Sequence, residues 1–148
     1  PPLFQIKRCA MGFFNKLFGK KDGGDGNDKW NAMWELWEQG EIPSPYNEML
    51  TYDSEMQSGG HLQFFINRAL RQENIFSVMA ALRETLPAGH AENVAQAYRQ
   101  YCMLGLDTGS DREIMQALDD DPLAASDRWY DEHEEELLDV LEAYADSL

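Results

Sequence analysis

The sequence predicts an all-α protein, a single compact bundle of about six or seven helices with a long acidic C-terminal helix. The first indication is that apolar residues recur three or four positions apart in segment after segment. The second is the absence of a sustained period-two pattern, and valine, which favours strands, occurs only three times. A chain of 148 residues, of which 43% are hydrophobic, is long enough to bury a core. We therefore expect one folded domain.

The chain divides into three parts by composition. Residues 1–21 contain five basic residues and no acid, residues 22–28 contain three glycines and three aspartates, and residues 29–148 form the acidic helical domain. We interpret the first part as a basic amphipathic appendage and the second as a flexible linker. The alternative is that residues 11–21 contact a membrane surface. The argument against it is that isolated helices of fewer than about 12 residues are only marginally stable. The residues before Met11 fit either native sequence or an upstream extension.

Four apolar stripes predict helices in the first two thirds of the domain. The first has Asp28 as its cap and ends before Gly40, and it consists of Trp30, Met33, Trp34 and Trp37. The second runs into the Gly59–Gly60 pair and consists of Tyr46, Met49, Leu50 and Met56. The third is stopped by Pro87 and consists of Ile75, Met79, Leu82 and Leu86. The fourth consists of Val94, Ala97, Tyr98, Tyr101 and Cys102.

Two further helix starts are marked by capping residues. Ser110 followed by Glu113 matches a capping box. Ser126 is a second cap, and because neither Gly nor Pro follows it, the segment from there to Leu148 is predicted to be the longest helix. Its apolar face, expected to be buried, consists of Trp129, Tyr130, Leu137, Val140, Leu141 and Tyr144. Its opposite side carries Asp131, Glu132, Glu135, Asp139, Glu142 and Asp146.

The charge density of this C-terminal segment is close to that of one DNA strand. Its 23 residues contain nine acids and one arginine and span about 35 Å as a helix, over which one DNA strand carries about ten phosphates. Like charges at helical spacing cost about 0.2 to 0.5 kcal/mol per pair, so the pattern is adverse to stability. The alternative interpretation is a solvated acidic face, the usual explanation of a charge run. An acidic turn precedes the segment and extends its acidic surface under both interpretations. It consists of Asp119, Asp120 and Asp121.

The overall charge argues against several classes of function. The formal net charge is -15, and from Trp30 onward there are 24 acids and six arginines. Such a domain repels nucleic acid and anionic lipid and attracts basic proteins. Cys9 and Cys102 do not form a disulfide framework, and no apolar run reaches the roughly 18 residues of a membrane span. We expect a cytoplasmic protein without direct contact to nucleic acid.

No constellation of residues predicts catalysis, a cofactor or a metal site. The three histidines are widely spaced, and the acidic turn lacks the spacing of a calcium loop. Neither cysteine and no serine lies in a nucleophile motif. We therefore expect no enzymatic activity. The alternative is an enzyme that uses His61, Gln63 and Asn67 beside a pocket.

The Gly59–Gly60 pair admits a phosphate loop, a hairpin or a helix corner. A phosphate loop requires Lys followed by Ser or Thr after its glycines, and histidine and leucine follow instead. A hairpin requires flanking strands, whereas helical patterns flank the pair. We predict a corner at which one helix ends and the next begins. We expect Phe64 and Phe65 to anchor the core, and Gln63 and Asn67 to bond the backbone at the turn.

The corner resembles the signature of a small bacterial all-helical family typified by an acidic DNA-mimic protein. The residues that carry the likeness are Glu55, Gly59, Gly60, His61, Gln63, Phe64, Phe65 and Asn67. The closing segment "LDDDPLAASDRWYDEHEEELLDVLEAY" is similar to that of the family, with an acidic turn, an Asp-Arg-aromatic-Tyr element and an acidic helix in order. The likeness covers Trp30 to Leu148. Ser58 stands where the family commonly has Asn.

The resemblance implies a protein that presents carboxylates in place of DNA phosphates. Such a protein occupies the DNA-binding face of a basic partner, such as a transcription regulator, and blocks its binding to DNA. The candidate partner-binding residues follow from charge alone, and they are Asp131, Glu132, Glu135, Asp139, Glu142, Asp146, Asp119, Asp120 and Asp121. The alternative from another class is an immunity or inhibitor protein that neutralises a cognate basic toxin. The oligomeric state stays open between monomer and dimer.

Overall fold

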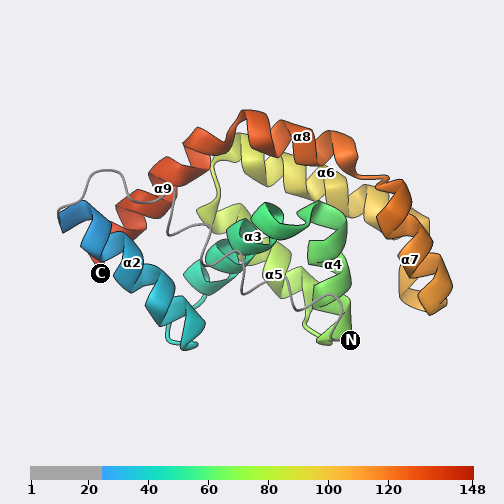
Figure 1. The fold of residues 1–148 in the computed structure, drawn as a ribbon, viewed down its shortest axis with the longest axis horizontal. Coiled ribbons are helices and arrows are strands. Elements are labelled where there is room, and N and C mark those ends of the chain that lie inside the picture. Colours follow the sequence, from blue (N-terminus) through green and yellow to red (C-terminus); the bar gives the residue numbers. More distant parts are fainter. Residues whose placement is uncertain (1–24) are drawn as a thin grey trace.

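The computed structural model describes residues 25–148, and this part of the chain is helical, without a strand (Figure 1). Its α-helices are α2 (Asp25–Glu38), α3 (Tyr46–Ser58), α4 (Gly60–Leu70), α5 (Ile75–Thr85), α6 (Ala88–Leu104), α7 (Asp111–Asp120), α8 (Ala124–Glu132) and α9 (Glu134–Ser147). A short 3-10 helix, η1 (Leu106–Thr108), follows α6. The predicted all-α class is confirmed, with slightly more helices than expected. The predicted appendage, residues 1–21, lies outside the described residues, as do residues 22–24 of the predicted linker.

Two groups of helices make up the bundle. Helix α3 packs against both α4 and α5, and α8 and α9 run above them in the view of Figure 1 as an arch that α7 continues at one end. Helix α6 lies along α8 and also contacts α4 and α5, while α2 packs against α9. The three C-terminal helices are therefore attached to the rest of the bundle through α2, α4 and α6.

The predicted tryptophan stripe on α2 forms one end of the core. Trp30, Trp34 and Trp37 are at most 7% exposed, and neighbouring rings meet edge to face with centroids 6.2 and 5.4 Å apart. The indole Nε1 of Trp37 donates to Thr51 Oγ1 (2.9 Å), which satisfies the polar atom of a buried ring. The expected cap at Asp28 is wrong, because α2 begins three residues earlier.

The Gly-Gly corner is confirmed, and each glycine has its own reason. Helix α3 ends at Ser58 and α4 begins at Gly60, whose φ of +90° lies in the region that favours glycine. A Cβ on Gly60 would also lie 2.3 Å from Asp127 Oδ2. Gly59 has a φ of -158°, which other residues also adopt, but a Cβ there would lie 2.2 Å from Gln63 Oε1. Space is therefore required at both positions, and an unusual backbone conformation at the second.

Several other sequence predictions are confirmed. Phe64 and Phe65 are 0% and 1% exposed and belong to the core. The capping box forms, because Glu113 N–H donates to Ser110 Oγ (3.2 Å) and Ser110 N–H donates to Glu113 Oε1 (2.9 Å). On the C-terminal helices the predicted apolar face is buried at Tyr130, Leu137 and Leu141 and half-buried at Trp129, Val140 and Tyr144.

The C-terminal segment is helical and acidic as predicted, but it is divided at His133 into α8 and α9. The His133 ring stacks on Trp129 with centroids 3.8 Å apart, and its carbonyl oxygen accepts a hydrogen bond from His90 Nε2 (2.8 Å). These contacts hold the chain out of the helix at that residue. Ser126 lies inside α8, so the predicted cap is wrong. The longest described helix is therefore α6, with 17 residues.

We expect Gly60→Ala to lower the free energy of unfolding by about 3 kcal/mol or more. The substitution has two costs. A residue other than glycine in the left-handed conformation costs about 1 to 2 kcal/mol. The added Cβ also displaces Asp127, whose hydrogen bonds are worth about 1.5 to 3 kcal/mol each. Gly40→Ala is the matched control, because Gly40 has φ +77° but nothing within 4 Å of an added Cβ. Denaturant titration measures both variants. Equal destabilisation of the two would contradict the role given to the Asp127 contact.

Candidate partner-binding surface

Acidic residues are concentrated on the three C-terminal helices. Residues 111–148 hold 14 acids and only two arginines. Helices α7, α8 and α9 follow one another along one edge of the molecule (Figure 1). We call the nine candidate residues on this edge the acidic arch: Asp119, Asp120, Asp121, Asp131, Glu132, Glu135, Asp139, Glu142 and Asp146.

The acidic arch is exposed to solvent. Eight of its nine residues are exposed, and Glu142 is half-buried. Asp131 and Glu132 lie at the end of α8 and the residues from Glu135 onward lie on α9, so the break at His133 divides the predicted stripe in two. Within residues 25–148, members other than Glu142 form no ion pair with Lys or Arg. The carboxylates therefore face solvent largely without neutralising partners.

Like charges raise the free energy of the arch near the junction of α7 and α8. Partial burial and the Asp127 carboxylate raise the pKa of Asp121. Partial burial, Asp127 and Glu132 raise the pKa of Asp131. The two aspartates in the last turn of α7 also meet the negative end of the helix dipole. A cation placed over this part of the surface would offset the repulsion between the carboxylates and their unfavourable interaction with the helix dipole.

Beneath the arch, Asp127 of α8 holds the N-terminus of α4. Its Oδ1 accepts hydrogen bonds from His61 N–H (2.9 Å) and from His61 Nδ1 (2.8 Å). Because Nδ1 then carries the proton, Nε2 accepts the hydrogen bond from the Tyr52 hydroxyl (2.7 Å). The carboxylate also lies at a helix N-terminus, where the dipole favours negative charge. One side chain thus connects α8, α4 and α3.

A second contact joins α8 to α3 through a buried carboxyl group. The Tyr130 hydroxyl donates to Asp53 Oδ1, and Gln57 Nε2 donates to the Tyr130 hydroxyl (3.2 Å) and to Glu134. Asp53 Oδ2 has no hydrogen-bond partner among the described residues. Burial raises the pKa of Asp53 to about 7, against the opposing hydrogen bond from Tyr130. The carboxyl group therefore exchanges its proton near neutral pH.

A third buried group, Glu55, lies on the α3 side of the corner. Its Oε1 accepts from Asn67 Nδ2 (2.7 Å) and its Oε2 from Arg68 Nη2 (2.5 Å). Gln63 Nε2 donates to Ser58 Oγ (3.2 Å). In these contacts the side-chain amides of Gln63 and Asn67 donate hydrogen bonds to other side chains, whereas we expected them to bond the backbone. The corner is thus stabilised by a charged pair and two amides.

The central residues of this polar network are buried, whereas Asp127, Gln57 and Glu134 at its edge are half-buried. His61, Asp53 and Glu55 are 0% exposed, and Gln63 and Asn67 are at most 3% exposed. The enzyme alternative requires histidine and amide groups that border a pocket. In this conformation these five side chains expose almost no surface to a substrate.

Sequence reasoning identified some of these residues without their contacts. Glu55 and Asp127 were identified only through the family resemblance, whereas Tyr130 was also predicted on the buried face of the C-terminal helix. Asp53 and Tyr52 were not noted. The only feature of the sequence that could have pointed to them is that a carboxyl group and a hydroxyl group stand within a stripe of apolar residues at helical spacing.

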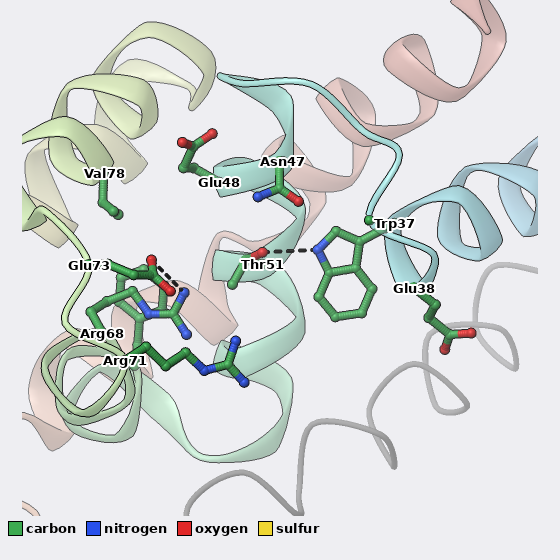
Figure 2. A pocket seen from close by; sticks show the side chains of 11 residues that line it. Trp37, Glu38, Asn47, Glu48, Thr51, Arg68, Arg71, Glu73 and Val78 are labelled. Atoms are coloured by element: carbon green, nitrogen blue, oxygen red, sulfur yellow. Dashed lines mark hydrogen bonds and ion pairs between the residues drawn. The ribbon is translucent and has the colours of Figure 1, made fainter.

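A cavity of about 220 Å³ lies away from the arch, between α2, α3, α4 and the start of α5 (Figure 2). Arg68 and Arg71 line it together with Glu73, whose Oε1 is 3.4 Å from Arg68 Nη1. The bonded pair Trp37 and Thr51 closes another side. Two further glutamates line the cavity, so its charges offset one another, and neither His nor Cys is present in its lining.

The fold and the surface define an acidic all-helical protein with a largely buried polar network and an exposed acidic edge. Residues 48–148 match a family described as DMP19-like protein, and the chain belongs to that family. The match starts at the beginning of α3, whereas we expected the likeness from Trp30. No curated protein and no solved structure matches the chain.

Two further properties concern the described residues only. No group of three or more His, Cys, Asp or Glu side chains in residues 25–148 is arranged to hold a metal ion. No helix in the same range has the length and apolar composition to cross a membrane.

Asp53 makes the stability of the fold depend on pH. Its pKa rises from about 3.9 in an unfolded chain to about 7 in the fold, so the folded state retains a proton that the unfolded state has lost. The stabilisation from this proton is complete below about pH 4 and is lost as the pH rises through about 7. We expect Asp53→Asn, which keeps an acceptor for Tyr130, to flatten this part of the profile.

Denaturant titration at a series of pH values measures the effect. Tyr130→Phe is the control, because it removes the hydroxyl but leaves the buried carboxyl group, and it should retain the pH dependence. An unchanged profile in Asp53→Asn would contradict proton binding by this residue.

Proposed function

We propose that this chain is a DNA mimic that acts in the cytoplasm. The acidic arch binds the DNA-binding face of a basic protein, such as a transcription regulator, and blocks its binding to DNA. The observation that carries the proposal is the row of exposed carboxylates along one edge of the fold, which, Glu142 apart, form no ion pair with Lys or Arg within residues 25–148. Membership of the DMP19-like family, a family of DNA mimics, supports it.

The charge density of the arch supports mimicry of phosphates. Helices α8 and α9 carry nine acids and one arginine over a path of about 35 Å, or one net negative charge for about every 4 Å. One DNA strand carries a charge for about every 3.4 Å. A protein surface that attracts phosphates therefore meets a similar field. Attraction of this kind speeds association and weakens with added salt.

The network beneath the arch supports the same function, because it fixes the positions of the carboxylates. Asp127 and Tyr130 connect α8 to α3 and α4. Charges held in place before binding lose less conformational entropy on binding than charges on a mobile chain. The same negative charge repels nucleic acid, so the proposed ligand is a protein and no catalysis is required.

Affinity capture with three forms of the chain tests the proposal. We expect wild type to retain a basic DNA-binding protein from cell lysate at low salt and to release it in a salt gradient, with mass spectrometry identifying it. Asp131→Lys, Glu135→Lys and Asp139→Lys together should weaken binding of that protein by about tenfold or more at low salt.

The control carries the same change in net charge at another place. Glu35→Lys, Glu38→Lys and Glu41→Lys alter three exposed acids on and after α2, and this variant should bind nearly as wild type does. Equal loss in both variants would show that only net charge matters and would contradict a defined binding surface. Capture of a basic toxin that has no DNA-binding activity would instead support the immunity alternative.

A further inference from the structure

An apolar groove lies beside the acidic arch. It is formed by the start of α3, the end of α5 and the last two turns of α9, and its volume is about 380 Å³. Tyr46 and Tyr144 stack in its wall with centroids 4.1 Å apart, and Val140 and Ala143 add apolar surface. Tyr46 is 38% exposed. Stacked aromatic rings that remain in solvent are surface that a bound segment would bury.

The rim of the groove is acidic. Glu84 lines it from α5. Helical spacing places Glu136 one turn before Val140 and Asp139 one turn before Ala143, so both carboxylates lie along the α9 wall. All three acids are exposed, and within residues 25–148 they have no ion pair with Lys or Arg. The groove therefore fits a segment that combines large apolar side chains with basic ones.

The chain contains a segment of this composition outside the described residues. Residues 11–21, "MGFFNKLFGKK", have four large apolar side chains besides Met11, three lysines and no acid. The residues concerned are Phe13, Phe14, Leu17, Phe18, Lys16, Lys20 and Lys21. The apolar side chains of the segment fit the apolar part of the groove. Its lysines are opposite in charge to the acidic rim.

The connection to α2 keeps this segment near the groove. Residues 22–24 separate Lys21 from Asp25, so Lys21 lies within about 14 Å of the start of α2. That start lies near the C-terminal end of α9 (Figure 1), where Lys29 Nζ donates to the Asp146 carbonyl oxygen (3.2 Å). A helix is about 10 Å across, so the connection is long enough to pass around α9 to the groove.

We propose that residues 11–21 dock in this groove, with the apolar side chains against the stacked tyrosines and the lysines over the acidic rim. A short tether gives an effective concentration on the order of millimolar, so an affinity of about a millimolar fills the groove about half of the time. The docked segment covers Asp139 of the acidic arch and competes with a basic partner. This competition rests on the proposed function, whereas the docking itself does not.

Paramagnetic relaxation enhancement in the full chain tests the docking without a partner. Cys9 and Cys102 are the two cysteines, and Cys102 is exposed and free, so Cys102→Ser leaves Cys9 as the one site for a nitroxide. At low salt we expect amide signals of residues 84–85 and 140–147 to lose about half of their intensity or more. About 1 M NaCl, with a Debye length of about 3 Å, should restore them.

Two further variants, each carrying the same label, separate docking from chance proximity. The triple variant Lys16→Gln, Lys20→Gln, Lys21→Gln should reduce the attenuation, as should Ala143→Lys, which places a cation in the groove at an exposed position. The matched control Ala125→Lys, at an exposed position on α8, should leave the attenuation unchanged.

Three results would overturn the proposal. The first is full intensity at residues 84–85 and 140–147 at low salt. The second is attenuation that the triple lysine variant does not reduce. The third is attenuation of an isotope-labelled chain by a separate nitroxide-labelled chain to the same extent, which would assign the groove to a second copy. Because no partner is present, each outcome is independent of whether the arch binds a DNA-binding protein.

Discussion

The hydrogen bonds of the Asp127 carboxylate are the contact on which the rest of the structure depends. The carboxylate accepts from both the backbone and the ring of His61, and it approaches α4 so closely that position 60 has no space for a side chain. The ring in turn accepts from Tyr52 on α3. The Gly-Gly corner and the carboxylate therefore require one another, although they are far apart in the sequence. The orientation of α8, and with it the direction of the acidic arch, follows from this contact.

Polar contacts in the core give this fold a defined geometry at some cost in stability. Asp53 has one oxygen without a partner, and Arg68 Nε is also without one among the described residues. Buried polar and charged groups of this kind contribute little net stability, which comes mainly from burial of the large apolar and aromatic side chains. The exposed acids add repulsion. The balance leaves the carboxylates of the arch in fixed positions, and within the described residues those other than Glu142 form no ion pair with Lys or Arg, as the proposed function requires.

Sequence patterns predicted the features that neighbouring residues determine. The tryptophan stripe, the helix boundary at the corner and the Ser110 capping box are each marked in the sequence by residues a few positions apart, and all three are confirmed. The break at His133 was not predictable, because it depends on His90, 43 positions away, and neither Gly nor Pro marks it. Helical spacing predicted the exposed acids of α8 and α9, whereas Asp119 and Asp120, which we expected in a turn, lie in the last turn of α7. The contacts of Asp53 and Asp127 were not predictable, because their partners are 77 and 66 positions away.

The central claim is that the acidic arch and DNA occupy the same face of a partner protein. The most direct measurement adds this chain to a complex of the captured partner with fluorescently labelled DNA and follows the anisotropy of the DNA. We predict complete release of the DNA, with the affinities for the chain and for DNA both falling steeply as salt rises. A stable ternary complex of chain, partner and DNA would contradict the claim.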